Sequence, residues 1–138
     1  MTSLDLGSNY LKGPVPSTVG TLTALAYLDL SDNQLTGRIP PEIAFLSDTL
    51  AELVLYSNGL TGTLPAELGE MKLLRALYLD SNALEGTIPT QLGDMKQMKD
   101  LRIRDNEFRR TIPTELGKLT NLEVLYLDTN ALTGPVPA

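Results

Sequence analysis

The chain contains neither cysteine nor histidine. The missing cysteines exclude a disulfide framework and any thiolate metal site. The missing histidines remove the commonest general base and the commonest metal ligand. Because no catalytic motif is present either, we expect a chain that is not an enzyme and that needs no cofactor and no metal ion.

Long apolar runs and a surplus of positive charge are also missing. No apolar stretch approaches the roughly 20 residues that a membrane-spanning helix needs, so we expect no membrane insertion of this chain. The 17 acidic residues outnumber the 11 basic ones, which gives a net charge of −6 and a pI near 4.5. This balance weighs against nucleic acid as a partner, since phosphate binding depends on positive potential.

What the chain does contain is one pattern, LxLxxNxLxGxIP, which occurs six times with few substitutions. A period this regular is typical of a solenoid, in which each coil buries its apolar side against its neighbours. We therefore expect one domain over residues 1–138 with about six coils, numbered here first to sixth. The asparagines that mark the coils are Asn9, Asn33, Asn58, Asn82, Asn106 and Asn130.

Each coil is predicted to contain a short parallel strand and a short helical turn. Two aliphatic residues separated by one variable residue precede every asparagine, as in Leu77-Tyr78-Leu79, and this is strand periodicity. An aliphatic residue and a proline follow the asparagine, and proline suits the first turn of a helix. Glycines close most of these turns, where we expect positive φ, at Gly20, Gly69, Gly93 and Gly117. The second coil carries one extra residue between Leu46 and Leu50, which should bulge outward and leave the strands in register.

The repeated asparagines are interpreted as structural. A coil that turns sharply leaves backbone N–H and C=O groups facing the interior, and an unpaired buried group costs about 1–3 kcal/mol. An asparagine amide can both donate and accept hydrogen bonds. A ladder of these amides is therefore predicted to satisfy the turns along the array.

At these positions the chain resembles the plant-specific type of leucine-rich repeat, found in receptor-kinase ectodomains and polygalacturonase-inhibiting proteins. The resemblance implies an α/β solenoid: a right-handed coil with a parallel concave sheet of six short strands and short helical or 3₁₀ turns on the convex side. It also implies a second, shorter strand near Thr36-Gly37, Thr61-Gly62 and Thr133-Gly134. Arg110 replaces the glycine of the other coils, which makes this strand doubtful in the fifth coil.

Two features of the family are missing from the sequence. The cysteine-containing caps that flank such arrays are absent, and no kinase motif is present. The sequence as written enters the first repeat at once, so we expect no secretion signal within it. The expected compartment is therefore cytoplasmic if the chain is complete as written, and extracellular if it is a fragment of a receptor-like ectodomain.

The family's function is recognition of proteins or peptides, mostly through the concave face, and we expect the same function here. Strand alternation projects a few variable residues of each coil onto this face. Tyrosines there would supply contact area, and charged residues would set specificity. The candidate partner-binding residues are Tyr27, Asp29, Glu52, Tyr56, Tyr78, Asp80, Arg102, Arg104, Tyr126 and Asp128.

Several alternatives stay open at this stage. The tyrosines can be explained as good strand formers that pair across a solvated sheet. Arg102 and Arg104 either neutralise neighbouring carboxylates or anchor a carboxylate of the partner. Glycoside hydrolysis by Asp29 and Asp32 and calcium binding are disfavoured, because an open sheet offers no enclosed pocket and no convergent loop. The main rival function is structural self-assembly, end to end, through the uncapped ends of the array.

Overall fold

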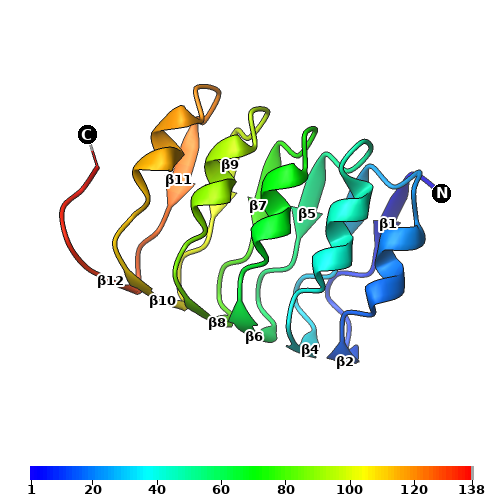
Figure 1. Ribbon diagram of the computed structural model, residues 1–138. Coiled ribbons are helices and arrows are strands. Elements are labelled where there is room, and N and C mark those ends of the chain that lie inside the picture. The colour runs from blue at the N-terminus through cyan, green and yellow to red at the C-terminus, as the bar shows by residue number, and fades with distance from the viewer. Residues whose placement is uncertain (138) are drawn as a thin grey trace.

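The computed structural model describes residues 1–137 and shows a solenoid of six stacked coils. Figure 1 shows the helices along one side of the stack and the long parallel sheet on the other. The predicted fold class is therefore confirmed: a leucine-rich repeat solenoid with a concave parallel sheet and 3₁₀ turns on the convex side.

The concave sheet contains one three-residue strand from each coil, in sequence order. Leucines in the middle of these strands pair in register from coil to coil, as Leu53 does with Leu28 and Leu77. Their side chains point into the core, and those of the central coils are fully buried. The strands are β1 (Ser3–Asp5), β3 (Tyr27–Asp29), β5 (Glu52–Val54), β7 (Ala76–Tyr78), β9 (Asp100–Arg102) and β11 (Val124–Tyr126).

A second parallel sheet follows the asparagines and forms the lower edge of the stack in Figure 1. Its strands are β2 (Lys12–Pro14), β4 (Gln34–Gly37), β6 (Gly59–Thr63), β8 (Ala83–Gly86), β10 (Glu107–Arg110) and β12 (Ala131–Leu132). The predicted strands near Thr36 and Thr61 are confirmed, whereas the sixth lies just before Thr133. The doubt about the fifth coil was wrong. Arg110 adopts φ 68°, close to the 75–84° of the equivalent glycines, so β10 pairs with both of its neighbours.

The helical turns are 3₁₀ helices of five or six residues. They are η1 (Ser17–Thr21), η2 (Pro41–Leu46), η3 (Ala66–Glu70), η4 (Thr90–Asp94) and η5 (Thr114–Lys118). Each begins directly after a proline with extended φ/ψ, as after Pro89 (φ −63°, ψ 133°). The extra residue of the second coil lengthens η2 and the turn after it, where the Leu50 N–H donates to the Leu46 carbonyl. The predicted register of the flanking strands is confirmed by the pair Tyr27 and Glu52.

The explanation given for the glycines in these turns was wrong. None of Gly20, Gly69, Gly93 and Gly117 has positive φ. A Cβ on Gly20 would instead collide with the carbonyl of Glu42, one on Gly69 with that of Gln91, and one on Gly93 with that of Glu115. At these three positions the helix of the next coil packs directly against the glycine, whereas nothing lies within 4 Å of a Cβ on Gly117.

The core is a continuous aliphatic stack that runs from Val15 to Leu119. The fifth coil places Phe108 where the other coils have leucine, and its ring is fully buried. No buried side-chain nitrogen or oxygen among the described residues lacks a hydrogen-bond partner. The buried polar side chains of the described residues therefore need no ligand to complete their hydrogen bonds.

The asparagine amides lie between the two sheets and join each coil to the preceding one. Asn82 is typical: its Nδ2 donates to the carbonyls of Leu55, Leu79 and Asp80, and its Oδ1 accepts from the Leu60 N–H. The residue before each asparagine has φ between 50° and 56°. That left-handed residue turns the backbone sharply, and the amide pairs the carbonyls that the turn exposes.

Candidate functional site

The concave sheet brings the ten sequence-selected residues onto one face. Cross-strand pairing defines two of its rows: Tyr27, Glu52, Ala76, Asp100 and Val124 form one, and Asp29, Val54, Tyr78, Arg102 and Tyr126 form the other. Tyr56, Asp80, Arg104 and Asp128 each lie two residues beyond a strand. They extend the face toward the turn that precedes the asparagine.

Arg102 is the centre of a cluster in the last three coils. Its Nε donates to Asp100 Oδ1 at 2.8 Å, and its Nη2 contacts Asp100 Oδ2 at 2.7 Å. The same carboxylate accepts a hydrogen bond from the Tyr78 hydroxyl at 3.0 Å. The Arg102 guanidinium also lies 4.7 Å from the ring centroid of Tyr78 and 5.2 Å from that of Tyr126, within range of a cation–π attraction.

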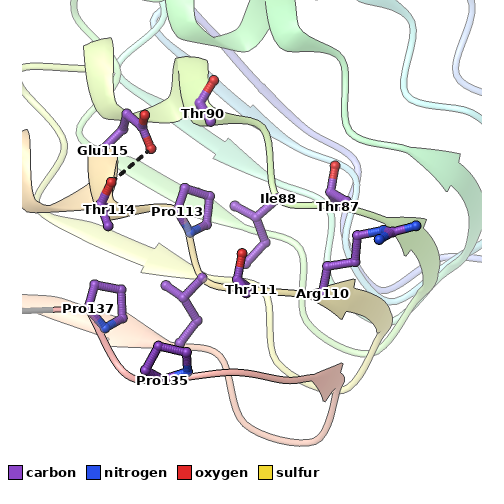
Figure 2. Close-up of a pocket in the computed structure, with 11 residues that line it drawn as sticks. Thr87, Ile88, Thr90, Arg110, Thr111, Pro113, Thr114, Glu115, Pro135 and Pro137 are labelled. Atoms are coloured by element: carbon purple, nitrogen blue, oxygen red, sulfur yellow. Dashed lines mark hydrogen bonds between the residues drawn. The ribbon is translucent and has the colours of Figure 1, made fainter.

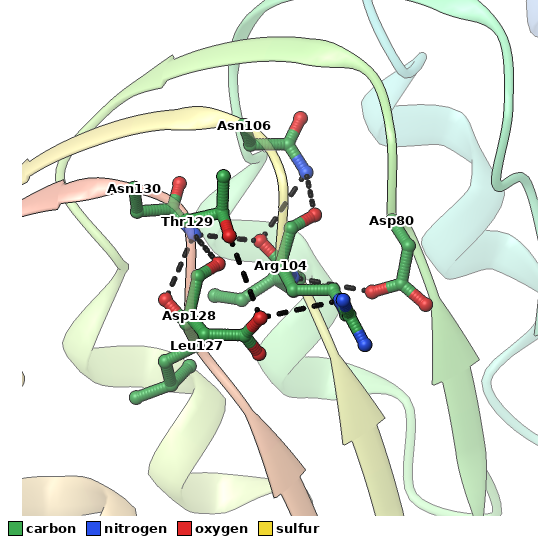
Figure 3. A network of polar contacts seen from close by, with 8 residues as sticks. Asp80, Arg104, Asn106, Leu127, Asp128, Thr129 and Asn130 are labelled. Atoms are coloured by element: carbon green, nitrogen blue, oxygen red, sulfur yellow. Dashed lines mark hydrogen bonds and ion pairs between the residues drawn. The ribbon is translucent and has the colours of Figure 1, made fainter.

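Arg104 lies next to this cluster and has looser contacts (Figure 3). Its Nε is 3.3 Å from Asp128 Oδ2, and its guanidinium is 6.0 Å from the Tyr126 ring centroid. Its backbone N–H donates to Asp80 Oδ1 at 3.1 Å. Burial raises the pKa of Asp80, while the hydrogen bond from Arg104 and the two nearby arginines act in the opposite direction.

The first coils present an acidic part of the same face. The Tyr27 hydroxyl donates to Asp29 Oδ2 at 3.0 Å, while Asp29 Oδ1 accepts from the backbone N–H and the hydroxyl of Ser31. Burial, the hydrogen bond to Asp29 and the surrounding carboxylates raise the pKa of Tyr27 to about 12. Asp29 is therefore held in place by three donors, and the Tyr27 hydroxyl keeps its proton at neutral pH.

The middle of the face has an apolar floor. Val54 and Ala76 belong to the outward rows, yet only 4% and 7% of their surface is exposed. They are not part of the aliphatic stack; Val54 pairs across strands with Asp29 and Tyr78, and Ala76 with Glu52 and Asp100. Tyr126 is the most exposed of the four concave tyrosines, at 43%. The face thus offers aromatic side chains over small apolar residues, flanked by charges of both signs.

A separate hollow lies beside the second sheet and η5 (Figure 2). It is lined by Thr87, Ile88, Thr90, Arg110, Thr111, Ile112, Pro113, Thr114, Glu115, Pro135 and Pro137. Glu115 is the only carboxylate among these side chains, so the hollow lacks the pair of carboxylates that acid–base hydrolysis requires. The sequence did not single out this hollow, because residues of the fourth, fifth and sixth coils line it together.

Residues 1–137 contain no group of three or more Asp or Glu side chains arranged to hold a metal ion. Across the same range, no helix has the length and apolarity needed to cross a bilayer.

Comparison with known proteins agrees with this architecture. A family profile described as a leucine-rich repeat region matches residues 3–134. The chain belongs to the leucine-rich repeat family. One relative, the LRR receptor-like serine/threonine-protein kinase GSO2 of Arabidopsis thaliana, is 38% identical over 72 residues. Those residues are 52% of this chain but 6% of the receptor, so this leucine-rich repeat chain matches only a small part of the relative.

Solved structures of the family show the same solenoid. The ectodomain of the Arabidopsis receptor kinase HAESA, in complex with an extended IDA peptide hormone, superposes with a TM-score of 0.93 at 33% identity. That alignment covers 99% of this chain and 22% of HAESA. The ectodomain of the Arabidopsis receptor kinase SOBIR1 gives a TM-score of 0.89 at 31% identity, covering 98% of this chain and 74% of the ectodomain chain in that structure.

Proposed function

We propose that this chain is a non-catalytic recognition module that binds a protein or peptide along its concave face. The observation that carries the proposal is the set of tyrosines on one open face, above the apolar floor of Val54 and Ala76. Tyrosine is frequent at interfaces because it offers a large contact area with little rotamer entropy to lose. The HAESA ectodomain, whose fold this chain shares, was solved with a bound peptide hormone.

Within this proposal, the ten concave residues divide by chemistry. Tyr27, Tyr56, Tyr78 and Tyr126 supply contact area. Asp29 and Glu52 give the first coils a negative face, while Asp80, Arg102, Arg104 and Asp128 form the mixed-charge part of the later coils. A ligand that lies along the sheet would match a positive group to the first coils and a carboxylate to the arginine region.

The test begins with a ligand selected in vitro. A random peptide library displayed on phage is panned against the immobilised protein, and enriched peptides are synthesised and titrated by fluorescence polarisation. Replacing Tyr56 and Tyr126 together with alanine should weaken binding at least tenfold, since truncating a central interface tyrosine costs about 2 kcal/mol. Neither hydroxyl has a hydrogen-bond partner among the described residues, so the fold should persist, as circular dichroism will show.

The control is Tyr10→Ala, which removes a tyrosine that is 85% exposed and lies outside the concave sheet. Binding should be unchanged in this variant. A library that yields no enriched peptide, or a double variant that binds as tightly as the wild type, would overturn the proposed site.

A second candidate function is self-association of the chain through its two end faces. In the chain as given, Leu6, Leu11, Leu125 and Val136 are exposed, whereas their equivalents in the middle coils are buried. Two such faces would stack as neighbouring coils do and bury apolar surface. Light scattering against concentration separates the two candidates: a rising mass supports self-association, and a constant monomer mass contradicts it.

A further inference from the structure

Arg102 and Arg104 lie two residues apart on the same face, yet their guanidinium groups are held very differently. Two nitrogens of Arg102 are bonded to both oxygens of Asp100, at 2.8 Å and 2.7 Å. Such a bidentate pair fixes orientation as well as charge. The Asp100 side chain is only 17% exposed, so the pair is shielded more than an ordinary surface ion pair.

The position of Arg102 in the sheet places a tyrosine on either side of it, and 36% of its side chain is exposed, compared with 49% for Arg104. Its cross-strand neighbours are Tyr78 on β7 and Tyr126 on β11, so a tyrosine ring approaches the guanidinium from each adjacent strand. The hydroxyl of Tyr78 ends on the same Asp100 carboxylate. Asp100 therefore fixes the tyrosine and the arginine at once.

Arg104 has weaker support: one tyrosine ring, that of Tyr126, lies 6.0 Å from its guanidinium, and no carboxylate holds it in a bidentate pair. Its one ion pair, to Asp128, is 3.3 Å long, and both side chains are about half exposed, at 49% and 55%. Exposed pairs of this kind contribute about 0–1 kcal/mol, because solvent competes for both charges. The terminal nitrogens of Arg104 donate no hydrogen bond to any described residue, so they are free to bind a ligand.

We infer that Asp100 makes Arg102 a positioning residue and leaves Arg104 as the guanidinium that a ligand meets. This inference rests on the proposed function and deepens it. The ligand class that fits carries a single carboxylate for Arg104 and, beside it, an aromatic or aliphatic side chain for the tyrosine rings that Arg102 holds apart. A second carboxylate next to the first should add no affinity, because the charge of Arg102 is already matched by Asp100.

The first experiment needs no ligand. Phenylglyoxal modifies accessible arginine side chains, and the extent at each position can be followed by peptide mapping with mass spectrometry. Arg110 serves as the internal reference, since its exposed side chain has no hydrogen bond or ion pair within residues 1–137. We expect Arg104 to react at a rate near that of Arg110 and Arg102 to react at least fivefold more slowly. Equal rates at Arg102 and Arg104 in the wild type would overturn the inference.

The second experiment removes the restraint with Asp100→Asn. The Arg102 rate should rise to within twofold of Arg104, while an Arg102 that stays protected would refute the role of Asp100. Glu107→Gln is the matched control, because it removes the same charge from the same coil but lies on β10 of the other sheet. It should leave all three rates unchanged. If Asp100→Asn fails to fold, the wild-type comparison still decides the question.

The ligand arm uses the selected peptides with one carboxylate and with a second carboxylate added beside it. Wild-type protein should bind the two forms of each peptide with equal affinity. The Asp100→Asn variant should bind the form with two carboxylates at least threefold more tightly than the form with one. A wild type that already prefers the second carboxylate contradicts the inference. If the tyrosine double variant binds as tightly as the wild type, the proposed function is contradicted instead. The phenylglyoxal rates would still test the inference about Arg102 and Arg104, because they need no ligand.

Discussion

The side-chain oxygen of Asn82 accepts a hydrogen bond, 3.0 Å long, from the backbone N–H of Leu60 in the preceding coil. The nitrogen of the same amide donates to the Leu55 carbonyl of that coil and to two carbonyls of its own turn. One side chain thus pairs four backbone groups across two coils. Within residues 1–137, the first asparagine, Asn9, pairs only the carbonyls of Leu6 and Gly7.

Asn82→Ala should therefore destabilise the protein far more than Asn9→Ala. The change leaves the Leu60 N–H unpaired, whereas the Leu55 carbonyl keeps its bond from Asn58, so we expect a loss of about 1–3 kcal/mol. The same change at the exposed Asn9 should cost less than about 1 kcal/mol, since water can replace its bonds. Urea unfolding measures both. Equal losses would show that the amides do not join the coils as the hydrogen bonds indicate.

Gly93→Ala and Gly117→Ala form a matched pair at one position of successive 3₁₀ helices. A Cβ on Gly93 would collide with the Glu115 carbonyl of the next helix, whereas nothing lies within 4 Å of a Cβ on Gly117. Overpacking of this kind costs about 1–3 kcal/mol, so Gly93→Ala should lower the unfolding midpoint. Gly117→Ala should be neutral or stabilising by up to about 1 kcal/mol, because alanine restricts the unfolded chain. Similar effects at both positions would contradict the packing explanation.

Arg110→Gly should stabilise the protein. Arg110 has φ 68°, a left-handed conformation that costs an L-residue with a side chain roughly 1–2 kcal/mol and costs glycine little. We expect a gain of about 1 kcal/mol, measured by thermal or urea unfolding. Arg109→Gly on the same strand provides the comparison: its φ is negative, so glycine there should lose about 0.5–1 kcal/mol. A loss of stability in Arg110→Gly would mean that its side chain contributes more than its backbone costs.

Tyr27 should make stability depend on pH in the alkaline range. Its pKa is raised from 10.0 to about 12, so the folded state holds the phenol proton more tightly than the unfolded state. The stability that this raised pKa contributes is fully present below pH 10 and is lost as the pH rises through about 12. Between pH 9 and pH 12, wild type should lose more stability than Tyr27→Phe, as urea unfolding at each pH will show. Parallel losses would mean that the phenol is not perturbed.

The repeat pattern alone was sufficient to establish the solenoid. The spacing of the asparagines, the paired leucines before them and the proline after them specify strand, turn and helix within each coil, because these are local properties of the backbone. The tyrosines and charged residues of the concave face could be selected for the same reason: a strand directs alternate side chains to opposite sides. Even the inserted residue of the second coil could be placed, because register is set by the leucines around it.

Contacts between coils determine the features of the structure that the sequence did not predict. The reason for Gly93 depends on the Glu115 carbonyl of the next coil, and the doubt about Arg110 disappeared because pairing with both neighbouring strands holds its unfavourable φ. The different states of Arg102 and Arg104 are likewise invisible in the sequence Asp-Leu-Arg-Ile-Arg. Asp100 lies on the same strand as Arg102, but only the stacked coils bring Tyr78 and Tyr126 to the same guanidinium. The distance between side chains of different coils depends on how the sheet packs and not on any local preference of the chain.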